Sequence, residues 1–186
     1  MSMTVMAGTK YPDMWVDPED DPRESDAVSL GDERATIMEY MRTQRLTLEL
    51  KCSELDAAGM AKRSVEPSTM SLLGIVRHMA DVEHSWMRRI MDGQDIPRLY
   101  FDPEDRDADW NGAVADPVVV DEAWAKWRTE CEFTDAFVAN APDMGMVDPK
   151  GEVSLRDVLI HLIEEYARHN GHADLIRERV DGRTGQ

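Results

Sequence analysis

Cysteine is nearly absent from this sequence, since Cys52 and Cys131 are the only two among 186 residues. Two cysteines that lie far apart in the chain do not make the disulfide framework of a small secreted protein. Each falls inside a predicted helix. We therefore interpret them as two buried thiols in a reducing cytoplasm, and a disulfide is the alternative.

Positive charge and long apolar runs are also scarce. The chain has 21 basic against 38 acidic residues, so its net charge is −17. Such a charge repels phosphate backbones and anionic membrane surfaces, which argues against nucleic-acid binding. No apolar run approaches the roughly 18 residues of a membrane span, and the N-terminus lacks the pattern of a secretory signal. We expect a cytoplasmic protein without a membrane partner.

Strand signals are few, because Val118–Val120 is the only notable β-branched cluster. The long segments show helical periodicity instead, and 42% apolar residues are enough for one core. The sequence therefore predicts an all-α domain. Four long helices are expected over residues 31–55, 71–93, 119–140 and 154–180.

Residues 93–117 form an unusually long connection for a helix bundle, with three prolines and six aspartates. Tyr100, Phe101 and Trp110 give this connection side chains that can pack down as a lid. We predict an up-down-down-up four-helix bundle with this long crossover between its second and third helices.

The N-terminal residues 1–28 are rich in proline and aspartate, which is typical of an arm without its own core. Tyr11, Met14 and Trp15 are expected to pin this arm against the bundle. The predicted division of the chain is thus an acidic arm at 1–28 and a four-helix bundle at 29–186.

The last predicted helix carries four metal-capable side chains on an otherwise apolar sequence: His161, Glu165, His169 and His172. At about 100° per residue, these four fall within a sector of roughly 80°. Burying so many polar groups is costly unless they have partners. The pattern therefore indicates a metal site.

Glu165 and His169 are four residues apart, so they can bind one ion from one helix face. His78 on the second helix is the best placed third ligand, and His161 is the alternative to His169. Two imidazoles and a carboxylate suit Zn²⁺ or another divalent first-row metal. Three protein ligands leave a position open, as in catalytic rather than structural zinc sites.

Other polar residues near these ligands receive simpler interpretations. His172 is a candidate acid or base at the mouth of the site, or a structural histidine. His84 is expected on the solvated surface, and Glu83 in a surface salt bridge, with support of the metal site as the alternative. Arg168 and Asn170 are expected to have ordinary helix-surface roles.

Two stretches, SLLGIVRHMADVEHSW on the second helix and EEYARHNGHADLIRE on the last, resemble the DinB-like metal-dependent bundle superfamily. The resemblance spans about residues 32–182. This superfamily includes mycothiol-dependent maleylpyruvate isomerase and the bacillithiol and mycothiol S-transferases. No segment remains for the isomerase's additional C-terminal domain, so the chain is most similar to the single-domain actinobacterial members.

The resemblance implies His78, Glu165 and His169 as metal ligands, with zinc as the first candidate and nickel, iron or manganese as alternatives. It also implies a low-molecular-weight thiol as co-substrate and a homodimer. The expected activity is thiol S-transfer to, or thiol-dependent isomerisation of, a small electrophile. Two other functions remain open: hydrolysis by metal-activated water, and a non-catalytic metal-binding role in stress response.

Overall fold

The computed structural model describes residues 14–24 and 31–185, and every regular element among them is helical. An isolated bridge between Val147 and Ser154 is the nearest approach to a strand in these ranges. The elements are η1 (Pro18–Asp20), α1 (Glu33–Cys52), α2 (Ala57–Ala61), α3 (Leu72–Glu83), η2 (His84–Met91), α4 (Ala108–Asn111), α5 (Pro117–Asn140) and α6 (Leu155–Asp181). The all-α prediction is confirmed.

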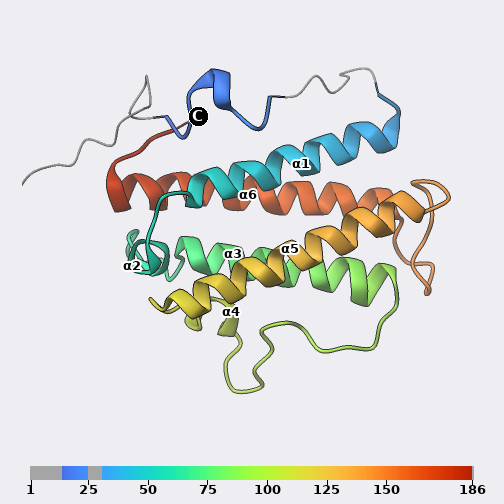
Figure 1. Cartoon of the computed structure of the whole chain (residues 1–186). Coiled ribbons are helices and arrows are strands. Elements are labelled where there is room, and N and C mark those ends of the chain that lie inside the picture. Colours follow the sequence, from blue (N-terminus) through green and yellow to red (C-terminus); the bar gives the residue numbers. More distant parts are fainter. Residues whose placement is uncertain (1–13, 25–30, 186) are drawn as a thin grey trace, which may run out of the picture.

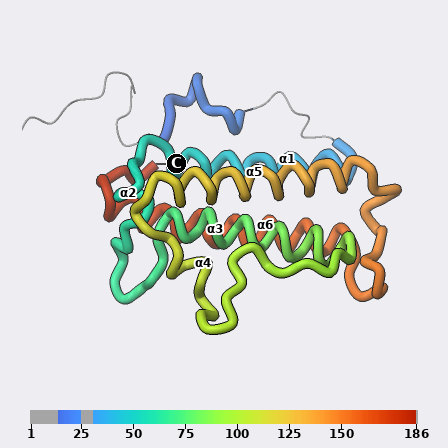
Figure 2. Tube along the Cα trace, turned by 60° about the horizontal axis from the view of Figure 1, so that its bottom comes forward, coloured from blue at the N-terminus to red at the C-terminus, as the bar shows by residue number. Residues whose placement is uncertain are grey.

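The four long helices form a bundle in which α1 and α6 run in one direction and α3 and α5 in the other (Figure 1). Around the bundle the order is α1, α6, α3, α5, as the second view makes clear (Figure 2). Among the four long helices, the most closely packed pairs are α3 with α5, α1 with α6, and α3 with α6. This is the predicted up-down-down-up arrangement, with residues 92–116 as the long crossover.

Short polar side chains fix where the long helices begin, because each accepts a hydrogen bond from a backbone N–H of the first turn. The capping residues are Asp32, Ser71, Asp116 and Ser154. Gly182, with φ of 87°, ends α6 in the left-handed conformation that glycine tolerates best. Two short helices, α2 and α4, lie where the sequence predicted loops.

Helix α3 continues without a break into η2, which is π-helical over eight residues. A π-helical segment changes the direction in which successive side chains point and is frequent at functional sites. The predicted second helix at 71–93 is thus one continuous helix, with an α-helical first part and a π-helical second part. Its second half carries Trp86 and Arg89.

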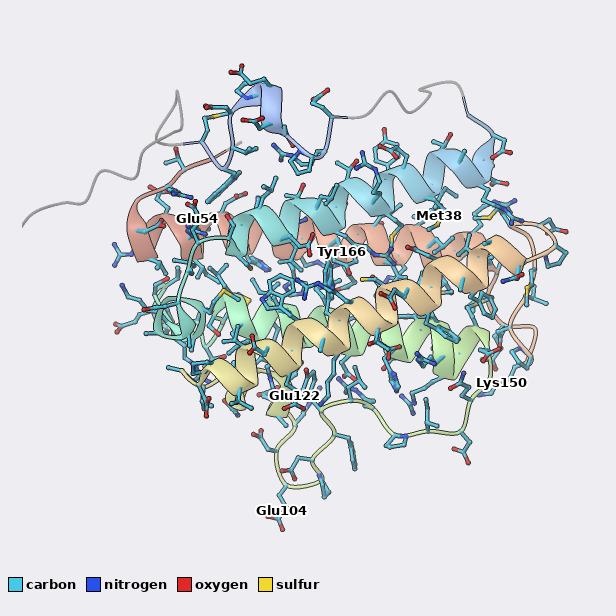
Figure 3. All side chains as sticks on the ribbon, in the orientation of Figure 1. Met38, Glu54, Glu104, Glu122, Lys150 and Tyr166 are labelled. Atoms are coloured by element: carbon cyan, nitrogen blue, oxygen red, sulfur yellow. The ribbon has the colours of Figure 1, made fainter. Side chains whose placement is uncertain are left out.

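A polar cluster joins all four long helices inside the core. The Glu83 carboxylate accepts bonds from Arg45 of α1 at 2.9 and 2.7 Å and from Thr134 of α5 at 2.6 Å. Tyr166 of α6 donates to it at 2.6 Å and in turn accepts from Trp127 at 2.8 Å. Tyr166 therefore lies in the middle of the bundle (Figure 3).

Burial raises the pKa of Glu83, but the charge of Arg45 and the hydrogen bonds from Arg45, Thr134 and Tyr166 outweigh it, so the pKa lies below its usual value. Glu83 is fully buried. The expectation of a surface salt bridge was wrong, because the pairing partner is supplied from inside the bundle by α1.

His84 was also placed wrongly on the surface. Its side chain is buried, and Nε2 lies 2.9 Å from the carbonyl oxygen of Pro97 in the crossover. The crossover therefore covers the face of η2 that carries His84. Cys52 and Cys131 are both free and buried, as predicted.

Trp15 of the N-terminal arm is buried against the end of α6. The guanidinium of Arg177 lies 5.4 Å from its ring centre, and Gly185 approaches the ring so closely that a Cβ there would collide with it. Met14 is half-buried, and Tyr11 lies outside the described residues. None of the helices in the described part of the chain has the length and apolar character that crossing a bilayer requires.

Candidate metal site

Three ligand atoms, one each from His78, Glu165 and His169, all lie within 4.8 Å of one another. His78 comes from α3, and the other two lie one turn apart on α6. Glu165 and His78 are half-buried and His169 is buried. The structure therefore brings together the three residues that the sequence predicted as ligands.

The antiparallel packing of α3 and η2 against α6 explains why they meet. The rings of His78 and His169 are 4.7 Å apart, and so are the rings of Trp86 and His161. The two ring pairs are separated by eight residues on each helix, so the two helices keep the same register along this contact. We call the contact marked by these four rings the α3–α6 seam.

Asp109 of α4 fixes the orientation of His78. Its Oδ2 lies 2.8 Å from Nδ1 of His78. Burial raises the pKa of Asp109, but the hydrogen bond and charge of His78 outweigh it and lower the pKa, so Asp109 is a carboxylate at neutral pH. A carboxylate only accepts, which places the proton of His78 on Nδ1 and leaves Nε2 free to bind a metal.

Helix α4 is held in place by Arg77 and Trp110. Arg77 donates to the carbonyl oxygens of Asp109 at 2.7 Å and Ala108 at 2.9 Å. The Trp110 ring stacks on His78 with centroids 4.9 Å apart and lies 5.8 Å from the ring of His169. Gly74 makes this approach possible, because a Cβ there would come within 2.7 Å of the Trp110 ring.

His169 is a neutral imidazole in this setting. Burial, followed by the neighbouring His78 and His172, lowers its pKa to about 4. Its Nε2 lies 3.6 Å from Glu165, and its Nδ1 lies 3.4 Å from Nδ1 of His172. A neutral imidazole carries its one proton on the nitrogen away from the metal, so the other nitrogen can bind a metal without first losing a proton.

The two carboxylate oxygens of Glu165 face different neighbours. Oε2 faces His169, whereas Oε1 accepts from Arg168 at 2.5 Å and lies 3.9 Å from His161. Arg168 is exposed, as predicted, but its charge holds the candidate ligand. His161 faces Trp86 on the far side of Glu165 and is not among the three atoms that converge.

The donor set fits a divalent first-row metal. Two imidazole nitrogens and one carboxylate oxygen are the ligands of many catalytic zinc sites. Both imidazoles also have a partner for their other nitrogen, which is how metal-binding histidines are usually oriented. The model of the mycothiol-S-transferase family matches residues 36–182, well over half of the chain.

The chain belongs to the mycothiol-S-transferase family. The matched residues include α1 from Thr36 and all of α3, η2, α4, α5 and α6. This confirms the resemblance to DinB-like proteins noted in the sequence. The comparison with curated proteins and the comparison with solved structures gave no match.

Two residues of this candidate site escaped the sequence analysis: Gly74 and Asp109. Trp110 was expected in a lid, and it does pack over the site, whereas Phe101 is 65% exposed and does not. Nothing distinguishes Asp109 from the other aspartates of the crossover in sequence. Its role depends on the fold of that segment.

Asn170 departs from its expected surface role. Its side chain is buried and donates to the backbone and side-chain oxygens of Gln44 at 3.0 and 2.8 Å. Its backbone carbonyl oxygen accepts from Nζ of Lys51 at 3.0 Å. Asn170 therefore ties α6 to α1 beside the site and faces away from it.

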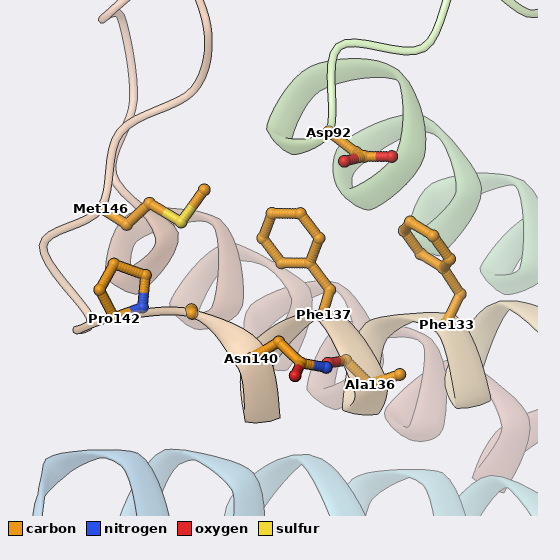
Figure 4. Close-up of a pocket in the computed structure, with 8 residues that line it drawn as sticks. Asp92, Phe133, Ala136, Phe137, Asn140, Pro142 and Met146 are labelled. Atoms are coloured by element: carbon orange, nitrogen blue, oxygen red, sulfur yellow. The ribbon is translucent and has the colours of Figure 1, made fainter.

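The family member also has an apolar pocket of about 360 Å³ at the end of α5. Phe133, Phe137 and Met146 point into it, and Asp92 is its one ionisable residue (Figure 4). A single carboxylate does not make a metal site. The pocket is therefore separate from the candidate ligands.

Proposed function

We propose that this chain is a divalent-metal-dependent thiol S-transferase whose thiol is mycothiol or a close relative. The proposal rests on one observation above all: the convergence of His78, Glu165 and His169 within 4.8 Å, with Asp109 and His172 beside the outer nitrogens of the two histidines. Membership of the mycothiol-S-transferase family supports the choice of thiol.

A divalent ion held there would stabilise a thiolate and so supply a nucleophile at neutral pH. The chain's residues would do the rest. Nε2 of His78, Nε2 of His169 and an oxygen of Glu165 would hold the ion. Asp109 and Trp110 would fix the plane of the His78 ring, and Trp110 would shield the site from water.

His172 is the candidate base in this proposal, since its half-buried ring lies next to His169. The thiol proton would pass to His172, and the sulfur would form a bond to the electrophilic carbon. The electron pair displaced from that carbon would go to the leaving group or the acceptor atom, which would take up the proton. No cysteine of the chain takes part, because both are buried.

We further propose that residues 29–186 are the catalytic unit and that residues 1–28 are an arm, pinned through Trp15. Zinc is the first metal to test, with nickel, iron and manganese as alternatives. The homodimer and the cytoplasmic location stay predictions, and gel filtration of the purified protein would test the first.

A reaction screen tests the activity. Metal-loaded protein is incubated with small electrophiles in the presence and absence of mycothiol, bacillithiol or glutathione, and the loss of free thiol is measured. We expect electrophile consumption that requires mycothiol and one bound metal. Consumption without any thiol would indicate hydrolysis instead, and no turnover at full metal occupancy would indicate a non-catalytic metal protein.

A further inference from the structure

The end of the α3–α6 seam marked by Trp86 and His161 borders a pocket. This pocket of about 500 Å³ is enclosed by η2, the start of the crossover and the loop that leads into α6. Its lining includes Trp86, Arg89, Asp95, Lys150 and Glu152. Lys150 marks this end of the bundle in Figure 3.

Several polar side chains of this pocket are unpaired. Asp95, Lys150 and Glu152 are exposed, and their side chains make no hydrogen bond or ion pair within the described part of the chain. Arg89 donates through Nε to the carbonyl oxygen of Ile96 and has its other guanidinium nitrogens free of such partners there. The pocket therefore offers donors and acceptors that a ligand can use.

The loop that carries Lys150 and Glu152 is ordered by Asp148. The buried carboxylate of Asp148 accepts backbone bonds from Lys150 at 3.0 Å, Glu152 at 2.6 Å and Val153 at 2.9 Å. The donors of these bonds are all main-chain N–H groups. The side chains of Lys150 and Glu152 remain available to the pocket.

Trp86 connects this pocket to the metal site. Its ring lines the pocket and also contacts the ring of His161, which lies 3.9 Å from Glu165. Trp86 lies eight residues after His78, and His161 lies eight residues before His169. At about 1.5 Å per helical residue, the two ring pairs are therefore about 12 Å apart along the seam. A ligand that reaches both places must span roughly that length.

We infer that this pocket binds the sugar end of the thiol, a neutral polyhydroxylated ring system, while the sulfur lies at the metal site. This rests on the proposed function. In mycothiol about eight bonds separate the sulfur from the second ring, and an extended chain advances about 1.25 Å per bond, so the reach is on the order of 10 Å. The second ring then extends beyond that distance, so the thiol is long enough to span the seam.

The chemistry of the lining selects a neutral polyol. An aromatic ring can pack against the C–H face of a sugar, and charged side chains can bond its hydroxyls. Arg89 and Lys150 are balanced by Asp95, Asp148 and Glu152. This near-neutral lining does not favour a dicarboxylate, as in the malyl group of bacillithiol.

The first test measures binding of the isolated headgroup, glucosaminyl-inositol, by ligand-observed NMR titration of the metal-loaded protein. Trp86→Ala and Glu152→Ala are expected to weaken binding by about tenfold and a few-fold respectively. The matched controls are Trp124→Ala on α5 and Glu104→Ala in the crossover, which are expected to bind as wild type. Equal binding by Trp86→Ala and wild type would overturn the proposal.

The second test compares whole and truncated thiols as substrates. Trp86→Ala is expected to raise the KM for mycothiol about tenfold and leave the KM for N-acetylcysteine, which lacks the rings, within twofold of wild type. Equal increases for both thiols would show that Trp86 acts on the metal site and not on the sugar.

The two proposals can fail separately. His169→Ala removes a candidate metal ligand, so it is expected to abolish transfer and retain headgroup binding. Mycothiol turnover without any headgroup binding by wild type would overturn the sugar site and leave the transferase. Headgroup binding that is lost in Trp86→Ala, in a protein that turns over no thiol, would uphold the sugar site and overturn the transferase.

Discussion

Asp109→Asn is the sharpest test of how the metal site is built. The two oxygens of Asp109 accept from different donors: Oδ2 from Nδ1 of His78 at 2.8 Å, and Oδ1 from the backbone N–H of Trp110 at 3.0 Å. An asparagine has one oxygen and one NH₂ group. The NH₂ group of an asparagine at this position must therefore face either Nδ1 of His78 or the N–H of Trp110, and both of these are donors.

If the amide nitrogen faces His78, the imidazole must move its proton to Nε2, the nitrogen that would bind the metal. If it faces Trp110, the backbone N–H of Trp110 meets a second donor and keeps only its bond to the carbonyl oxygen of Asp107, so the Trp110 ring is expected to shift from its place on His78. Replacing such supporting groups typically weakens metal binding by about 10–100-fold, or roughly 1.4–2.8 kcal/mol. We expect Asp109→Asn to lie in this range.

Zinc affinity would be measured by competition with a chromogenic chelator, with unfolding by urea as a check on overall stability. Asp102→Asn is the matched control, because Asp102 is exposed in the same crossover and bonds only the backbone N–H of Glu104 in the described structure. A zinc affinity of Asp109→Asn within twofold of wild type would refute this account of His78.

Further predictions concern the ligands, the core and the thiols. His169→Ala is expected to lose stoichiometric zinc in metal analysis, whereas His161→Ala keeps it; the reverse result would make His161 the ligand. Glu83→Gln removes the buried charge that faces Arg45 and leaves this buried guanidinium with the exposed Asp135 as its ionic partner, so urea unfolding is expected to show a loss on the order of 3 kcal/mol. Because the pKa of Glu83 is lowered on folding, its contribution is present above its unfolded pKa and shrinks as pH falls through its folded pKa; an unchanged difference between variant and wild type at low pH would contradict this. Burial raises the pKa of the Cys52 thiol to about 12 and that of Cys131 further, so an aromatic disulfide reagent is expected to label neither in the native protein and both in urea.

The helices and the three candidate ligands that converge could be predicted because their signals are local or periodic. Ser71 and Ser154 cap helices within one turn, and Glu165 and His169 share a helix face at a spacing of four. His78 could be chosen because it lies beside the apolar ridge of the second helix. Each of these inferences needs only the geometry of one helix and the general rules of bundles.

The failures share a cause: each depends on what a distant segment places against a helix. Glu83 is buried because Arg45, on another helix, supplies its charge, and His84 because the crossover returns over it. Asp109 meets His78 only once the crossover has folded back onto α3, where Arg77 bonds its backbone carbonyl oxygen. Sequence periodicity describes one element at a time and cannot predict such contacts.

The close approach of Gly74 to Trp110 has a consequence for how such a protein can diverge. Any side chain at position 74 needs the space that the indole ring occupies, and the indole is what covers the imidazole of His78. The two positions are expected to change in concert, with a larger residue at 74 tolerated where a smaller one stands at 110. A lineage that alters one alone would uncover the candidate metal site, so this pair would be a marker of which relatives have kept the proposed site.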